Sequence, residues 1–240
     1  MQVLVTRSKE DATSLMEELG SRKIGSVLAS LLEIKFFGGP VLDLDGVQAL
    51  LMTSANGVRA FSKRSDDRAL RVVAVGDATA QAARGHGFDD VISAEGDVNH
   101  LASTVIRGLK PEDGKLLHPT GSAVAGCLEG VLGTAGFSYQ RAVLYEAKVV
   151  DCLPTIARDG LLNGAFGSVL IYSPRTGVTF HRLVTESGLA STLYKVHAFC
   201  LSAYVADAIK ILPWASIFVA PRPEQAALLA QLEKFVREGS

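Results

Sequence analysis

Short apolar runs alternate along the chain with longer stretches in which apolar residues recur at helical spacing. The runs QVLVT at residues 2–6 and ALLMT at 49–53 are typical of strands buried on both faces of a parallel sheet. Each such run is followed by a stretch whose apolar residues return every three to four positions, as in a helix that covers a sheet. The alternation therefore predicts an α/β fold built on parallel sheets.

The same pattern locates the individual elements. Gly20 is expected to end the first helix, while residues 27–33 and 151–160 carry no assignment. Strands are expected at residues 2–6, 34–37, 49–53, 71–75, 90–93, 115–118, 140–147, 168–172, 196–199 and 217–220. Helices are expected at residues 8–19, 55–64, 78–85, 98–109, 123–135, 176–185, 204–212 and 224–237.

An internal repeat divides the chain into two copies of one α/β unit. LLMTSANGVRAF at residues 50–61 resembles VLIYSPRTGVTF at 169–180, and VVAVGDATAQAA at 72–83 aligns with VHAFCLSAYVAD at 196–207. A weaker similarity relates the segment that begins at Leu4 to the segment that begins at Leu117. Two similar doubly wound parallel-sheet domains are a simpler explanation of this repeat than one long sheet.

The order of the repeated segments predicts a discontinuous domain. Residues 115–147 supply a strand, a helix and a strand to the first copy, and only the start of the chain offers the equivalent segment to the second copy. The simplest assembly therefore joins residues 1–37 with 150–240 in one domain and inserts residues 38–149 as the other. Two strand-like connections then link the domains, and such a double connection permits hinge motion.

Composition excludes several classes of protein. Of the 240 residues, 48% are hydrophobic and 20% are charged, which excludes an intrinsically disordered chain. Lys and Arg together number 24 and Asp and Glu 25, so the formal charge is −1 and no nucleic-acid partner is expected. No apolar run has the length of a membrane span, and the start does not resemble a signal peptide, so no membrane partner is expected.

The cysteines and histidines indicate neither a disulfide framework nor a metal site. Cys127, Cys152 and Cys200 are odd in number and far apart, so we expect reduced thiols, buried as small hydrophobic side chains, in a cytoplasmic protein. The five histidines show no spacing typical of metal ligands, so no metal is expected.

Polar, turn-rich segments follow several predicted strands. In open parallel sheets ligands bind beyond the carboxyl ends of the strands, where backbone N–H groups of helix starts and hydroxyls bind carboxylates or phosphates. For any single Ser or Thr an ordinary N-cap is the preferred interpretation, but their convergence from two domains favours an anion-binding site. The segments are TRS at 6–8, TSANG at 53–57, GDAT at 76–79, HPTGS at 118–122 and SPRTG at 173–177.

Motifs of other enzyme classes are incomplete in this chain. GSAVAG at residues 121–126 has the spacing of a P-loop, but Cys127 stands where that motif requires a lysine. The chain contains neither a GxGxxG dinucleotide motif nor a GxSxG nucleophile elbow. The remaining candidate site is rich in hydroxyl groups and poor in catalytic bases.

Four motifs, in their order and spacing, resemble the uroporphyrinogen-III synthase family: VTR at 5–7, TSANGVRAF at 53–61, VAVGDATAQAARGHG at 73–87 and VLYEAK at 143–148. The resemblance implies two α/β domains with the discontinuous connectivity described above. It also implies a lyase of haem biosynthesis that acts as a monomer without cofactor or metal. Such an enzyme cyclises the linear tetrapyrrole hydroxymethylbilane to uroporphyrinogen III, with inversion of ring D and loss of water.

The resemblance also suggests site residues. Tyr145 matches a tyrosine that the family places in its site, where it would donate a hydrogen bond to the departing hydroxyl; packing of a strand tyrosine at a sheet edge is the alternative. For Arg7, a surface ion pair with Glu10 or Asp11 is the alternative to binding a carboxylate. The residues expected to bind substrate are Thr6, Arg7, Ser54, Thr79, Ser173 and Ser202.

Two departures from the family pattern keep a second function open. The second copy reads CLSAY at residues 200–204 in place of GxxTA, so that Ser202 has to replace the hydroxyl from a neighbouring position. The GSAVAG segment also lacks a basic residue. The alternative is a non-catalytic two-lobe anion-binding protein of the same fold. A sensor module is disfavoured because no DNA-binding element is visible.

Overall fold

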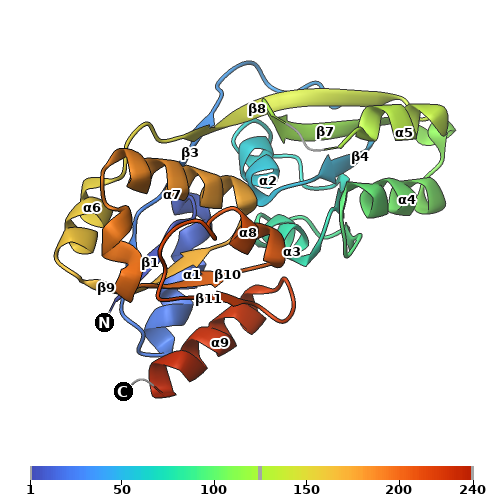
Figure 1. Ribbon diagram of the computed structural model, residues 1–240. Coiled ribbons are helices and arrows are strands. Elements are labelled where there is room, and N and C mark those ends of the chain that lie inside the picture. The colour runs from blue at the N-terminus through green and yellow to red at the C-terminus, as the bar shows by residue number, and fades with distance from the viewer. Residues whose placement is uncertain (1, 124–125, 239–240) are drawn as a thin grey trace. The chain divides into compact units, whose positions relative to one another are not determined.

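The computed structural model describes residues 2–123 and 126–238, and they form two compact units (Figure 1). Unit 1 comprises Met1–Glu33 and Lys148–Ser240, and unit 2 comprises Ile34–Ala147. Each unit contains its own parallel sheet with helices on both faces, which confirms the predicted α/β class.

Unit 1 is built on a five-stranded sheet in the order β11-β10-β9-β1-β2, and all four strand pairs are parallel. Its strands are β1 (Gln2–Val5), β2 (Ser26–Leu28), β9 (Phe166–Ile171), β10 (His197–Cys200) and β11 (Ser216–Val219). Its helices are α1 (Lys9–Ser21), α6 (Thr155–Leu162), α7 (Pro174–Glu186), α8 (Ala203–Asp207), α9 (Gln225–Glu238) and the 3₁₀ helix η2 (Ala190–Lys195).

Alternation along the strands of unit 1 directs side chains into two separate cores. Leu4 points to the side covered by α6, α7 and α8, whereas Val3 and Val5 point to the side covered by α1 and α9. The strands are mostly apolar because both faces of the sheet are buried, as expected for parallel strands.

Unit 2 contains a six-stranded sheet in the order β3-β8-β7-β4-β5-β6. Its strands are β3 (Leu32–Phe36), β4 (Val47–Met52), β5 (Arg71–Ala74), β6 (Val91–Ser93), β7 (Lys115–Gly121) and β8 (Tyr139–Val149). Its helices are α2 (Ala55–Ser62), α3 (Asp77–Gly85), α4 (Val98–Gly108), α5 (Leu128–Thr134) and the 3₁₀ helix η1 (Pro111–Asp113). Helices α2 and α3 cover one face and α4 and α5 the other. The boundary between the two units falls within β3 and β8.

The two sheets repeat one topology. The order β2-β1-β9-β10-β11 in unit 1 corresponds to β8-β7-β4-β5-β6 in unit 2, and the equivalent helices cover the equivalent faces. In unit 1 this arrangement is the 2-1-3-4-5 order of flavodoxin-like sheets. In unit 2 the same spatial order is 5-4-1-2-3 when the strands are numbered along the chain, which is a circular permutation of the unit 1 order. The sequence repeat is therefore confirmed as a repeat of strand order. Strand β3 is an addition to unit 2 at the outer edge of β8.

Several predicted elements differ from the structure. The first helix continues past Gly20 to Ser21, because Lys23 adopts φ 58° and Ile24 N–H bonds the carbonyl of Leu19, closing the helix without a glycine. The short strand β2 and helix α6 were not predicted, and α8 ends at Asp207 rather than 212. The helix expected at 123–135 begins at Leu128, and residues 124–125 of that prediction lie outside the described residues.

Strand β7 extends beyond the predicted 115–118 through Pro119 to Gly121. Its pairing with β4 ends at Leu117, whereas its pairing with β8 continues to Tyr145. Pro119 therefore lies where the strand has a single neighbour, and a proline is tolerated there although it lacks a backbone donor.

Cys200 is buried as predicted, but Cys127 and Cys152 are exposed, so the expectation of three buried thiols was wrong. Cys127 is the N-cap residue of α5, and Cys152 lies in the connection between β8 and α6, so neither position is in the core. Among the described residues, none of the helices combines the length and the apolar character that crossing a membrane requires.

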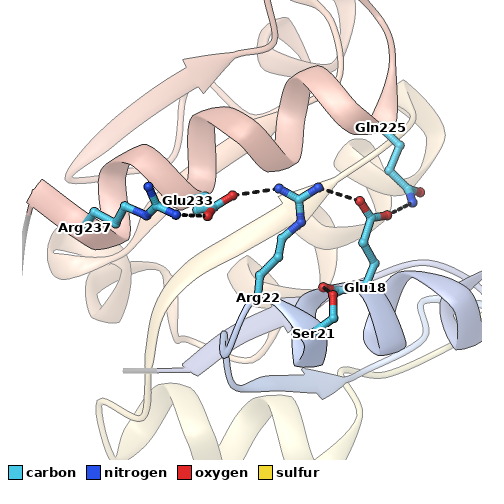
Figure 2. A network of polar contacts seen from close by, with 6 residues as sticks. All are labelled: Glu18, Ser21, Arg22, Gln225, Glu233 and Arg237. Carbon is cyan, nitrogen blue, oxygen red and sulfur yellow. Dashed lines mark hydrogen bonds and ion pairs between the residues drawn. The ribbon is translucent and has the colours of Figure 1, made fainter.

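A network of hydrogen bonds and ion pairs joins α9, the last helix of unit 1, to α1, the first (Figure 2). Arg22 at the end of α1 bonds Glu18 at 2.8 Å and Glu233 of α9 at 2.7 Å, and Gln225 of α9 donates to Glu18 at 2.9 Å. The Glu18 carboxylate raises the pKa of Arg22 above its usual value. Because these half-buried charges form a connected network, we expect them to stabilise the α1–α9 packing more than isolated surface pairs would.

Gly57 brings α2 close to strand β7. A Cβ atom at Gly57 would lie 2.6 Å from the carbonyl oxygen of Pro119, closer than real side-chain carbons approach backbone atoms. We expect Gly57→Ala to lower the free energy of unfolding by about 1–3 kcal/mol, because α2 has to move away from the sheet. Urea denaturation with far-UV circular dichroism measures this change. Gly133→Ala in α5 meets no atom within 4 Å and is the control, expected to be neutral or slightly stabilising. Equal midpoints for both variants would contradict the prediction.

Candidate functional site

The strand order defines one candidate binding position in each unit. In a 2-1-3-4-5 sheet the chain turns to opposite faces after the two adjacent strands 1 and 3, and ligands bind at their carboxyl ends. We call this position the switch point. It lies between β1 and β9 in unit 1, and between β7 and β4 in unit 2.

Thr6 follows β1 at the switch point of unit 1 and is fully buried. Its hydroxyl donates to the carbonyl oxygen of Leu170 in β9 at 2.8 Å. The hydroxyl hydrogen is thus used to join the two strands, and in this conformation it does not serve a ligand. The binding role predicted for Thr6 stays a prediction.

Arg7 is held beside Tyr172 at the same switch point. Its guanidinium lies 4.5 Å from the centre of the Tyr172 ring, donates to Gln225 at 3.1 Å and stands 4.0 Å from Asp11. Burial raises the pKa of Tyr172, and its hydroxyl has no hydrogen-bond partner among the described residues. The stacking and the Gln225 contact place the cation at the carboxyl ends of β1 and β9, where an anion would bind. The sequence offered no local signal for Tyr172.

Ser173 and Ser202 begin helices after the next two strands. Ser173 is the N-cap of α7, and its Oγ accepts from the Thr176 N–H at 3.1 Å and contacts the Thr176 hydroxyl at 2.8 Å. Ser202 occupies the N-cap position of α8 but makes no side-chain capping bond. The capping interpretation therefore accounts for the hydroxyl of Ser173 and does not account for that of Ser202.

In unit 2, Ser54 and Thr79 occupy the corresponding positions after β4 and β5. Ser54 is the N-cap of α2, and its Oγ accepts from the Asn56 N–H at 3.1 Å. Thr79 lies in the first turn of α3 and is buried, while the N-cap is Gly76. The structure thus groups the predicted residues by unit, each at the carboxyl end of a strand, and their predicted binding roles remain predictions.

Tyr145 lies in β8 beside the switch point of unit 2. It pairs with Gly121 at the end of β7, its backbone carbonyl accepts from the Ser122 N–H at 2.9 Å, and its ring centre is 6.4 Å from that of Phe36. Only 8% of Tyr145 is exposed, so the packing interpretation holds for its ring. A Cβ atom at Gly121 would lie 2.9 Å from the Tyr145 ring, so the glycine lets the ring pack on the backbone.

Two further side chains of unit 2 were not assigned a site role from the sequence. Arg141 of β8 donates to the carbonyl oxygens of Gly121 and Ser122, both at 2.8 Å, and so fixes the turn after β7. His118 of β7 contacts both Thr53 and Tyr139. The signal for His118 was its position at the start of the polar segment HPTGS that follows the apolar residues of β7. In the described part of the chain, no group of three or more His, Cys, Asp or Glu side chains could hold a metal ion.

Two repeated parallel sheets, with polar side chains at the carboxyl ends of their strands, define an α/β protein with one candidate binding position in each unit. The sequence model of the HEM4 family, described as uroporphyrinogen-III synthase HemD, matches residues 13–230. The chain therefore belongs to this family, as its motifs predicted.

Solved structures agree with this fold. Uroporphyrinogen-III synthetase from Helicobacter pylori is 16% identical, with 98% of this chain and 99% of that chain covered and a TM-score of 0.66. A mutant uroporphyrinogen III synthase from the extremely thermophilic bacterium Thermus thermophilus is 13% identical, with 99% and 100% covered and a TM-score of 0.52. At these identities the matches establish the fold alone. A search of curated proteins finds no match.

Proposed function

We propose that this protein cyclises hydroxymethylbilane to uroporphyrinogen III, with inversion of ring D and loss of water, as a lyase of haem biosynthesis. The observation that carries the proposal is the family match over residues 13–230, which spans parts of both units. Because the family match includes both copies of the repeat, it supports a function in which both units take part.

The donors at the two switch points suit a substrate with eight carboxylates. Because the formal charge of the chain is −1, such a polyanion has to be held by placed groups rather than by a general positive field. Arg7 is the cation that we assign to a substrate carboxylate in unit 1. Ser202, whose hydroxyl makes no capping bond, and the helix starts after Ser54 and Ser173 add neutral donors.

Tyr145 is the residue that we assign to the departing hydroxyl. Loss of water requires that the C–O bond breaks while a proton reaches the leaving oxygen, and it yields a delocalised azafulvene cation. A phenol is a weak acid, so we assign Tyr145 a hydrogen bond to the leaving oxygen, and the proton that completes the departing water comes from solvent. The ring contact with Gly121 supports a fixed orientation for this bond.

The finer assignments belong to the same proposal. We propose a monomer in the cytoplasm, where the thiols of Cys127, Cys152 and Cys200 stay reduced. We also propose two domains, residues 1–37 with 150–240 and residues 38–149. The unit boundaries within β3 and β8, a few residues from these limits, support that division.

Incubation with freshly generated hydroxymethylbilane tests the proposal. The products are oxidised and the type I and type III isomers are separated by chromatography. We expect type III to exceed the type I product of spontaneous cyclisation, and heat-denatured protein is the control. A type I product at the spontaneous rate would contradict catalysis and leave the non-catalytic anion-binding alternative.

A further inference from the structure

Three side chains from three strand segments form a continuous hydrogen-bonded chain in unit 2. The Oγ1 atom of Thr53, just after β4, lies 3.0 Å from Nε2 of His118 in β7. The Nδ1 atom of the same ring lies 2.6 Å from the hydroxyl of Tyr139 at the start of β8. His118 is 3% exposed, so its two ring nitrogens are satisfied by these two partners rather than by bulk water.

Burial determines the protonation states of His118 and Tyr139. Burial and the positive charge of Arg141 lower the pKa of His118 to about 4, so the imidazole is neutral at pH 7. Burial raises the pKa of Tyr139 to about 12, although Arg141 opposes this change, so the phenol keeps its proton. A neutral imidazole donates one hydrogen bond and accepts one.

These protonation states fix which group donates in each of the two hydrogen bonds. A phenol is a stronger hydrogen-bond donor than an aliphatic hydroxyl, and the shorter of the two contacts is the one with Tyr139. The Tyr139 hydroxyl therefore donates to Nδ1, and Nε2–H donates to Thr53. The oxygen of Thr53 is then an acceptor toward His118, and its own hydrogen is directed elsewhere.

No second partner for the Thr53 hydroxyl is found within residues 2–123 and 126–238. Thr53 is partly exposed and immediately precedes Ser54 at the switch point of unit 2. We propose that Thr53 donates its hydroxyl hydrogen to an anionic oxygen of the ligand, and that His118 and Tyr139 are positioning residues that hold this hydrogen in the required direction. The inference rests on the proposed function, in which that oxygen belongs to a substrate carboxylate.

A purely structural role would not require these residue types. Replacing buried, mutually bonded polar groups by apolar groups of the same shape is often nearly neutral for stability. Neighbouring positions of β7, Leu116 and Leu117, are buried leucines, so this strand accommodates apolar side chains. We therefore assign these three hydrogen-bonded side chains a role in ligand binding through Thr53, the member that is partly exposed.

The expected result is a loss of affinity that depends on the Thr53 hydroxyl. Thr53→Val should raise KM for hydroxymethylbilane about tenfold with kcat changed less than about twofold, because one hydrogen bond to a charged group is lost. Thr53→Ser, which keeps the hydroxyl, should restore KM to within about twofold of the original. Thr134→Val in α5 is the matched control, since that hydroxyl bonds the Gly130 carbonyl of its own helix.

Coupling to Tyr139 distinguishes positioning from general stabilisation. Tyr139→Phe should raise KM about threefold in the parent protein and leave KM unchanged in the Thr53→Val protein, because the hydroxyl that it orients is already gone. An equal rise in both backgrounds, or no rise with Thr53→Val, overturns the inference. The same comparison is made in a Thr53→Ala protein, so the result does not depend on whether the Thr53→Val protein folds.

Calorimetric titration with uroporphyrin III, an oxidised octacarboxylate of the product's skeleton, separates the two proposals. If the protein forms no type III isomer, the proposed reaction fails. A Kd for uroporphyrin III that is about tenfold higher for Thr53→Val than for the parent would still support donation by Thr53. If type III forms and both KM and Kd are unaffected by Thr53→Val, the reaction stands and the assignment of Thr53 is overturned.

Discussion

Replacing Tyr145 by phenylalanine is expected to lower kcat for uroporphyrinogen III formation by roughly 10- to 100-fold, less than for most general acids because Tyr145 donates a hydrogen bond and not a proton. KM should change less than about threefold, because the hydrogen bond to the leaving oxygen strengthens only as the C–O bond breaks. The fold should tolerate the change, since the ring remains and continues to pack beside Phe36 and Gly121.

The control for this substitution is Tyr194→Phe. Tyr194 lies in η2, just before the amino end of β10, and is 61% exposed, so it should retain the parent kcat. Initial rates of type III formation over a range of hydroxymethylbilane concentrations measure both variants. A parent-like kcat for Tyr145→Phe would remove Tyr145 from the reaction and leave it a packing residue of the unit 2 core, where it also lies.

The free energy of unfolding is expected to fall by up to about 3 kcal/mol as the pH decreases from 6.5 to about 4 because of His118 alone. Its pKa is lowered from 6.5 to about 4 in the folded protein, by burial and then by the positive charge of Arg141. Between these values the unfolded chain binds a proton that the folded chain does not. The contribution is therefore fully present above pH 6.5 and is lost as the pH falls toward 4.

Urea denaturation at several pH values, on the parent protein and on His118→Gln, isolates this effect. The other titrating groups contribute to both curves and cancel in the difference. The difference in the free energy of unfolding between the two proteins should change steadily between pH 6.5 and 4 and be constant above 6.5. A constant difference over the whole range would show that the imidazole titrates alike in both states and would contradict its burial in β7.

Local periodicity was sufficient for most of the fold. Buried strands such as β4 and β9 are continuous apolar runs, and the helices after them carry apolar residues at helical spacing, so both are recognisable without knowledge of their neighbours. Strand β2 is different: it has three half-buried residues and exists because it pairs with β1. The end of α1 is similar, since the left-handed conformation of Lys23 is accompanied by the burial of Ile24 in the unit 1 core.

The candidate site was predictable only in part. Ser54 and Ser173 stand directly before helix starts, a position that sequence spacing reveals, and both are N-caps. The Thr53–His118–Tyr139 chain had no such signal, because its members are 65 and 21 residues apart and meet only through the pairing of β7 with β4 and β8. Arg7 and Gln225, 218 residues apart, meet in the same way.

The sequence alone therefore determined the α/β class, the repeat and the family, because these depend on apolar spacing within short segments and on the order of short motifs along the chain. Tertiary structure decided which side chains share a switch point and which of their hydroxyls are bonded within the protein. Those properties depend on strand order and burial, which bring distant residues within hydrogen-bond distance and move the pKa of His118 and Tyr139 in opposite directions.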